Sequence, residues 1–113
     1  MSDPIRLEMT QELIDIGQKC VGNHCPIAEL INTLDWTASI YVGVDDVTFF
    51  RTDQGPTWPQ VELGADDELN EVIEHYDETG EMWLGTLVLD LTNATATYER
   101  KEISYAGRDA TQD

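Results

Sequence analysis

The sequence predicts one α+β domain in which an antiparallel four-stranded sheet carries helices on one face, in the order α-α-β-β-α-β-β. Three observations lead to this prediction. Apolar residues follow a helical spacing in three segments and a strand-like pattern in four others. The chain has 113 residues, close to the commonest length of one domain. Apolar residues make up 41% of it, enough for a single core within residues 1–113.

Two helices are predicted near the N-terminus. The first covers about residues 8–21, with Thr10 as its N-cap, because apolar residues recur at intervals of three and four. These residues are Met9, Leu13, Ile16 and Cys20. The second starts at Pro26, since proline suits the first helical turn, and ends near Asp35. Its apolar face consists of Ile27, Leu30, Ile31 and Leu34.

The pattern then changes to alternation, which predicts a strand over 36–44 and another over 47–52. Asp45-Asp46 separates them, so the two strands are expected to form a hairpin. Residues 53–64 are predicted to be a loop because of their glycine and proline content.

A third helix is predicted over about 65–78, followed by Gly80 as its C-terminal stop. Two more strands follow at 82–91 and 95–103, joined by a turn at 92–94, and residues 104–113 are expected to form a flexible tail. Eight side chains are predicted to be buried: Trp36, Ile40, Phe49, Leu69, Val72, Ile73, Leu87 and Leu89.

The net charge limits the partners of the protein. Twenty-three acidic residues against six basic ones give a formal charge of −17, and no Lys or Arg occurs between Arg51 and Arg100. Such a surface repels nucleic acid and anionic lipid and attracts cationic proteins. We therefore expect a basic protein partner, with no direct binding of nucleic acid and no membrane association.

The N-terminal residues and the cysteines indicate a cytoplasmic protein. The N-terminal sequence has no basic region followed by an apolar block, as a secretory signal would have. Cys20 and Cys25 are too few for a disulfide scaffold and are expected to stay reduced.

No catalytic motif stands out, so an enzyme is not predicted. Cys20, His24, Cys25 and His75 contain the atoms that bind zinc, but their spacing matches no closed zinc module, and we predict no metal or other cofactor. The pair Asp45-Asp46 is interpreted as a hairpin tip. The segment 66–68 is interpreted as the acidic first turn of the third helix, where negative charge is favourable.

The outer face of the third helix is the predicted binding surface. Asp67, Glu71, Glu74 and Glu78 lie at i, i+4, i+7 and i+11 with no base among them. Like charges at i,i+4 cost about 0.2–0.5 kcal/mol per pair, so stability alone does not favour this pattern. Asp53 and Trp58 are predicted at its edge. The alternatives are an ordinary solvated face and the general acidity of proteins from a salt-loving host.

Aromatic positions give a family resemblance over about residues 10–103. Trp36 precedes Ile40-Tyr41-Val42, Phe49-Phe50 follow, and Trp83 precedes Leu87-Val88-Leu89-Asp90 with Tyr98 in the returning strand. In these positions and in the order of its elements the chain resembles the small acidic YezG-like immunity proteins of bacterial toxin systems. The loop at 55–59 and the short helix at Pro26 depart from that pattern. The resemblance implies a cytoplasmic antidote that binds a cognate toxin domain.

The sequence thus leads to an immunity protein that neutralises a basic bacterial toxin, expected to be a nuclease, through an acidic surface. A DNA-mimic inhibitor of a restriction or DNA-binding protein is the alternative, with its carboxylates spread along an elongated body. A small enzyme is the third class, and it requires a pocket with convergent polar groups.

Overall fold

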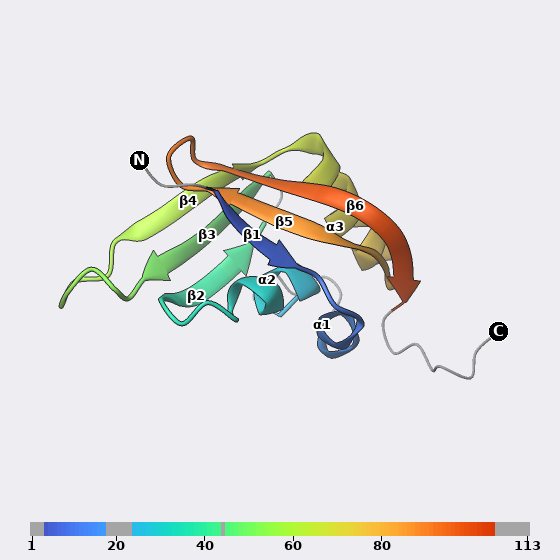
Figure 1. Ribbon diagram of the computed structural model, residues 1–113, viewed down its shortest axis with the longest axis horizontal. Helices are drawn as coiled ribbons and strands as arrows, with labels where there is room; N and C mark the ends of the chain where they lie inside the picture. Colours follow the sequence, from blue (N-terminus) through green and yellow to red (C-terminus); the bar gives the residue numbers. More distant parts are fainter. Residues whose placement is uncertain (1–3, 18–23, 44, 106–113) are drawn as a thin grey trace.

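The computed structural model of the protein describes residues 4–17, 24–43 and 45–105 (Figure 1). Its elements are β1 (Ile5–Glu8), α1 (Gln11–Ile16), α2 (Pro26–Ile31), β2 (Thr37–Val42), β3 (Asp46–Arg51), β4 (Gln60–Ala65), α3 (Asp67–Thr79), β5 (Glu81–Asp90) and β6 (Thr95–Tyr105).

The strands form one six-stranded sheet in the order β1-β5-β6-β4-β3-β2. Every neighbouring pair is antiparallel except β4 and β6, which are parallel and paired only at Gly64–Thr95 and Ala65–Ala96. The sheet therefore consists of two antiparallel halves joined by a short parallel seam. The α+β class is confirmed, but the prediction of four strands, all antiparallel, is wrong.

Two strands were missed. In β1, Ile5 and Leu7 alternate with charged neighbours, but this run is only four residues long, and Met9 directly after it also fits the helical spacing of the predicted first helix. In β4, Leu63 is buried within the segment predicted to be a loop, because Gly and Pro outweighed a short alternating pattern. The described order is consequently β-α-α-β-β-β-α-β-β.

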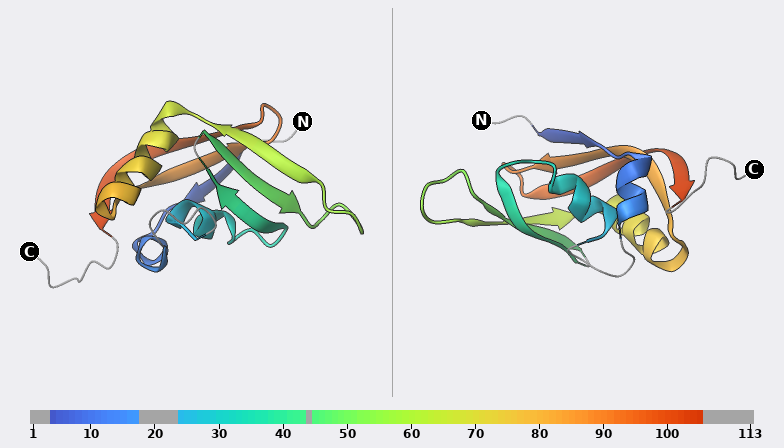
Figure 2. Two further views of the ribbon diagram at one scale, coloured as in Figure 1. Left: turned by 180° about the vertical axis from the view of Figure 1, so that it is seen from behind. Right: turned by 90° about the horizontal axis from the view of Figure 1, so that it is seen from below.

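The sheet is curled, and the helices lie on its concave side (Figures 1 and 2). Two irregularities accompany the curl. The β2–β3 register shifts between Ala38 and Tyr41, and the β5–β6 register shifts between Leu84 and Gly85. Bulges of this kind bend a strand and increase its twist. Helix α2 contacts both edge strands, β1 and β2, and so spans the open side of the curl.

Helix α1 is shorter than predicted. Thr10 is its N-cap, as expected, and its Oγ1 accepts a hydrogen bond from the Leu13 N–H at 3.2 Å. Of the predicted apolar face, Met9 is buried and Leu13 packs against the core, but Ile16 is 54% exposed and Ile14 is buried in its place. The helix stops at Gly17, where a Cβ would lie 2.5 Å from the Pro26 ring. Cys20 lies outside the described residues.

The remaining elements agree more closely with the sequence. Pro26 opens α2, although this helix ends at Ile31, with Asn32 as its C-cap, and not near Asp35. The predicted hairpin is formed by β2 and β3. Helix α3 is capped by Asp66, which accepts the Leu69 N–H at 2.8 Å, and ends at Gly80 with φ 80°. Strand β6 continues to Tyr105, so residues 104 and 105 do not belong to the predicted tail. The rest of that prediction, residues 106–113, lies outside the described residues.

The core is largely as predicted. Six of the eight expected side chains are buried, namely Ile40, Phe49, Leu69, Val72, Leu87 and Leu89. Trp36 and Ile73 are half-buried. Trp36 packs edge-on against Phe49, and the Arg51 guanidinium lies over the Trp36 ring, 5.0 Å from its centroid. No helix in the described ranges is long and apolar enough to cross a membrane.

Candidate protein-binding surface

Helix α3 presents the four predicted carboxylates on its exposed side. Leu69, Val72 and Tyr76 are buried on the opposite side, so the helical period directs Asp67, Glu71, Glu74 and Glu78 outward. We call these four residues the acidic stripe. Counted from Asp67 to Glu78 at 1.5 Å per residue, the stripe is about 16 Å long.

One member of the stripe is neutralised by another element. Arg100 on β6 reaches α3, where its Nε lies 3.1 Å from Glu68 Oε2 and its Nη1 lies 3.0 Å from Glu71 Oε1. Helix α3 contains no Lys or Arg, yet Glu71 does have a cationic partner. Sequence reasoning could not find this pair, because 29 positions and a change of element separate the two residues.

A stacked cluster continues from Arg100 along the flank of α3. The Arg100 guanidinium lies 4.8 Å from the centroid of the Trp83 ring, and the His75 ring also lies 4.8 Å from it. His75 Nε2 is 2.8 Å from Glu81 Oε1. This flank was missed as well. A usable signal was the spacing of Glu68, Glu71 and His75 at i, i+3 and i+7, which defines a second polar stripe beside the first.

The other carboxylates of the stripe are uncompensated. In the part of the chain that the structure describes, Asp67, Glu74 and Glu78 have no cationic partner. The four Lys and Arg side chains in that part are all engaged: Arg6 with Glu99, Arg51 with Asp53, Arg100 with Glu68 and Glu71, and Lys101 with Glu8. No Lys or Arg of the described residues therefore pairs with these three carboxylates.

The β2–β3 hairpin tip joins this surface. Asn70 Nδ2 donates to Asp45 Oδ1 at 2.8 Å, and the Asp45 N–H donates to Asn70 Oδ1 at 3.1 Å. Asp45 has φ 71°, a left-handed conformation that Asp tolerates better than most residues. Because Asn70 lies one turn from both Asp67 and Glu74, the tip extends the acidic stripe sideways.

Asp53 and Trp58 lie elsewhere. Both belong to the loop between β3 and β4, which Figures 1 and 2 place at the opposite end of the molecule from α3. Arg51 holds Asp53 through two hydrogen bonds, of 3.1 and 2.9 Å, and so lowers the pKa of that carboxyl. Trp58 is 53% exposed. The six predicted residues thus form two separate groups.

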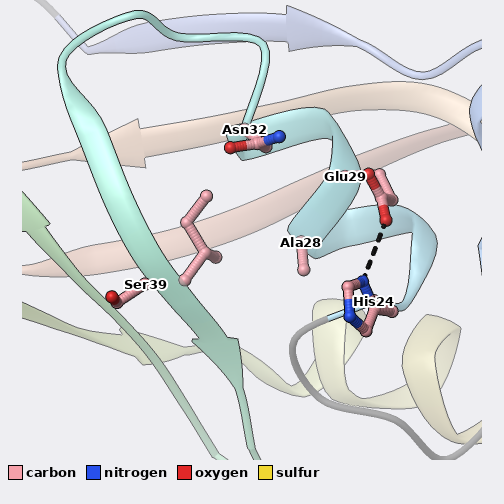
Figure 3. Close-up of a pocket in the computed structure, with 6 residues that line it drawn as sticks. His24, Ala28, Glu29, Asn32 and Ser39 are labelled. Carbon is pink, nitrogen blue, oxygen red and sulfur yellow. Dashed lines mark hydrogen bonds and ion pairs between the residues drawn. The ribbon is translucent and has the colours of Figure 1, made fainter.

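A pocket of about 220 Å³ lies between α2 and β2 (Figure 3). It is lined by His24, Ala28, Glu29, Asn32, Ser39 and Ile40. His24 Nδ1 lies 3.4 Å from Glu29 Oε2, and Ser39 stands on the far side of the pocket from this pair. The hydroxyl and the imidazole therefore do not form a nucleophile–base pair, which needs contact at about 2.6–3.2 Å.

The residues considered for zinc are not brought together where they can be placed. His24, just before α2, pairs with Glu29, whereas His75, on α3, pairs with Glu81 at the start of β5. Cys25 is buried, and burial raises the pKa of its thiol to about 11. No group of three or more His, Cys, Asp or Glu side chains suited to a metal ion occurs among the described residues.

Comparisons with known proteins gave no relative. No protein-family model, no curated protein and no solved structure matches this chain.

Proposed function

We propose that this protein binds a basic protein through the acidic stripe and the adjoining hairpin tip, and that it acts as an immunity protein that neutralises a basic toxin domain. One observation carries the proposal. Within the described residues, three carboxylates on one exposed helical face have no cationic partner, and every Lys and Arg there is already paired. A cationic partner supplies the missing counter-charges.

The energetics support an intermolecular role for the stripe. Glu74 and Glu78 stand at i,i+4, where like charges destabilise a helix by about 0.2–0.5 kcal/mol. The α3 C-terminus is also unfavourable for Glu78, because the helix dipole is negative there. Arg or Lys side chains of a bound partner replace the repulsion between Glu74 and Glu78, and the unfavourable interaction of Glu78 with the helix dipole, by attraction.

A nuclease toxin suits this surface. Its active site must attract phosphate, so it carries the cationic groups that an acidic helix attracts. Complementary charge raises association rates toward about 10⁸–10⁹ M⁻¹s⁻¹, which favours rapid capture of a toxin. The stripe occupies a single helix beside the Trp83 ring, and this concentration favours an immunity protein over a DNA mimic with charges along its whole length.

The proposal is tested by co-expression with a toxin domain encoded next to this gene. We expect this chain to restore the growth of cells that express the toxin domain and to form a complex with it that survives gel filtration. Growth without a complex would point to an indirect effect. Failure of both would remove the proposed function.

A further inference from the structure

The pocket between α2 and β2 has an apolar floor and a polar rim. Ala28 and Ile40, both nearly inaccessible, form the floor. Asn32, Ser39 and the Glu29–His24 pair are arranged around Ala28 (Figure 3). The lining thus offers a short hydrophobic surface that is surrounded by hydrogen-bonding groups.

The carboxylate at the rim is incompletely satisfied. Glu29 is 22% exposed at its side chain, and its contact with His24 measures 3.4 Å. Hydrogen bonds between cations and carboxylates usually measure about 2.7–2.9 Å. Glu29 therefore keeps the capacity to bind a closer cation that enters the pocket.

The backbone next to the pocket is strained. Ser39 has φ 52°, in the left-handed region that a non-glycine residue seldom adopts, and it lies at the β2 bulge. The bulge directs Ile40 into the core and leaves Ser39 exposed at the rim. Strain of this kind occurs often at ligand sites, and here it shapes one wall of the pocket.

Size and charge define the occupant. Pockets for drug-sized ligands and cofactors measure about 300–1,000 Å³, so a volume near 220 Å³ suits one long amino-acid side chain. The Glu29 carboxylate and the net charge of −17 disfavour an anion. An alkyl stem would cover Ala28 and Ile40 while its cationic end meets Glu29.

We infer that this pocket receives a lysine or arginine side chain of a protein partner, as a second anchoring point in addition to the acidic stripe. The inference rests on the proposed function for the identity of the partner. The chemistry of the pocket can be tested without that partner.

The experiment titrates the protein with n-butylammonium and n-butylguanidinium as side-chain probes. Binding is measured by NMR as the chemical-shift changes of the Ala28 and Ile40 methyl groups. Both probes should give saturable shifts at these methyls with dissociation constants in the millimolar range, while butyrate and n-butanol should not. Glu29→Gln should weaken probe binding by about tenfold or more. His24→Gln should strengthen it, because the competing imidazole is gone. Glu102→Gln, an equal charge change on β6, should alter it less than about twofold.

Equal shifts with n-butanol would show a merely apolar pocket and overturn the inference, as would unchanged binding in Glu29→Gln. If Glu29→Gln does not fold, His24→Gln is the deciding variant. The inference expects it to strengthen probe binding, and unchanged or weaker binding would overturn the inference. Failure of the proposed function is distinguishable, because it appears as a toxin domain that does not bind this chain, whatever the probes do.

Discussion

At Gly85 the backbones of β5 and β6 approach so closely that a side chain has no room. A Cβ at this position would collide with the Glu99 carbonyl, a backbone atom that cannot move aside. Gly85 stands at the β5 register shift, where the extra β6 residue increases the bend of the strand. The close approach of the two strands at this bend therefore requires a residue without a side chain at position 85.

Gly85→Ala should destabilise the protein by about 1–3 kcal/mol, the usual effect of overpacking. Gly64→Ala is the matched control, since the nearest atom to a Cβ there is 3.8 Å away and the chain is also in a strand. That control should change stability by less than about 0.5 kcal/mol. Urea unfolding monitored by tryptophan fluorescence measures both. Equal effects of the two variants would contradict the close approach at Gly85.

Cys25 gives a prediction with a defined pH dependence. Burial raises the pKa of its thiol from 9.0 to about 11, so the folded state holds the proton more tightly than the unfolded state. This contribution to stability is complete below about pH 9 and is lost as pH rises through about 11.

In a Cys20→Ser background at pH 8, an aromatic disulfide reagent should react with native protein far more slowly than with protein unfolded in urea. Rapid labelling of the native thiol would show that Cys25 is accessible.

At the scale of elements, α3 carries both the best-predicted structure and the least predictable contact. Its apolar spacing and its caps are local features, so its existence, its ends and its buried face follow from the sequence. The Arg100 contact depends on how β6 lies beside α3, which no local pattern encodes. The same reason explains the separation of Trp58 from the stripe, and the parallel seam of β4 with β6.

The internal pairing of Glu71 leads to different outcomes for substitutions within one stripe. Glu74→Gln with Glu78→Gln should stabilise the protein by a few tenths of a kcal/mol, because mutual repulsion and the unfavourable dipole term are removed. Glu71→Gln should not stabilise it, since its ion pair with Arg100 is lost as well. Urea unfolding at low salt compares the two variants. A gain of the same size from Glu71→Gln would mean that the Arg100 contact contributes nothing.

At the scale of the whole molecule, paired cations lie on both faces of the sheet. On one face, Arg6 with Glu99 and Lys101 with Glu8 form ion pairs across β1, β5 and β6. Arg100 lies on the other face, beside α3. Acidity that merely follows from a salt-loving host would not require three uncompensated carboxylates to line up on one exposed helical face.

Association with a basic toxin domain should therefore slow steeply as salt rises from about 50 to 500 mM, whereas dissociation should change less. Stopped-flow fluorescence gives both rates. An association rate that is indifferent to salt would assign the acidity to solubility or host adaptation and not to recognition.

The central claim is that the uncompensated part of the acidic stripe forms the interface, and a comparison of two variants with equal charge tests it most directly. One variant carries Asp67→Asn, Glu74→Gln and Glu78→Gln, and the other carries Glu12→Gln, Glu62→Gln and Glu102→Gln, which are exposed on other elements. The measurement is the dissociation constant for the toxin domain, with unfolding curves as the check on folding. We predict that the stripe variant binds at least about 100-fold more weakly, equivalent to roughly 2.7 kcal/mol, while the control variant changes by less than about fivefold. Equal losses in two folded variants, or no loss in the stripe variant, would contradict the claim.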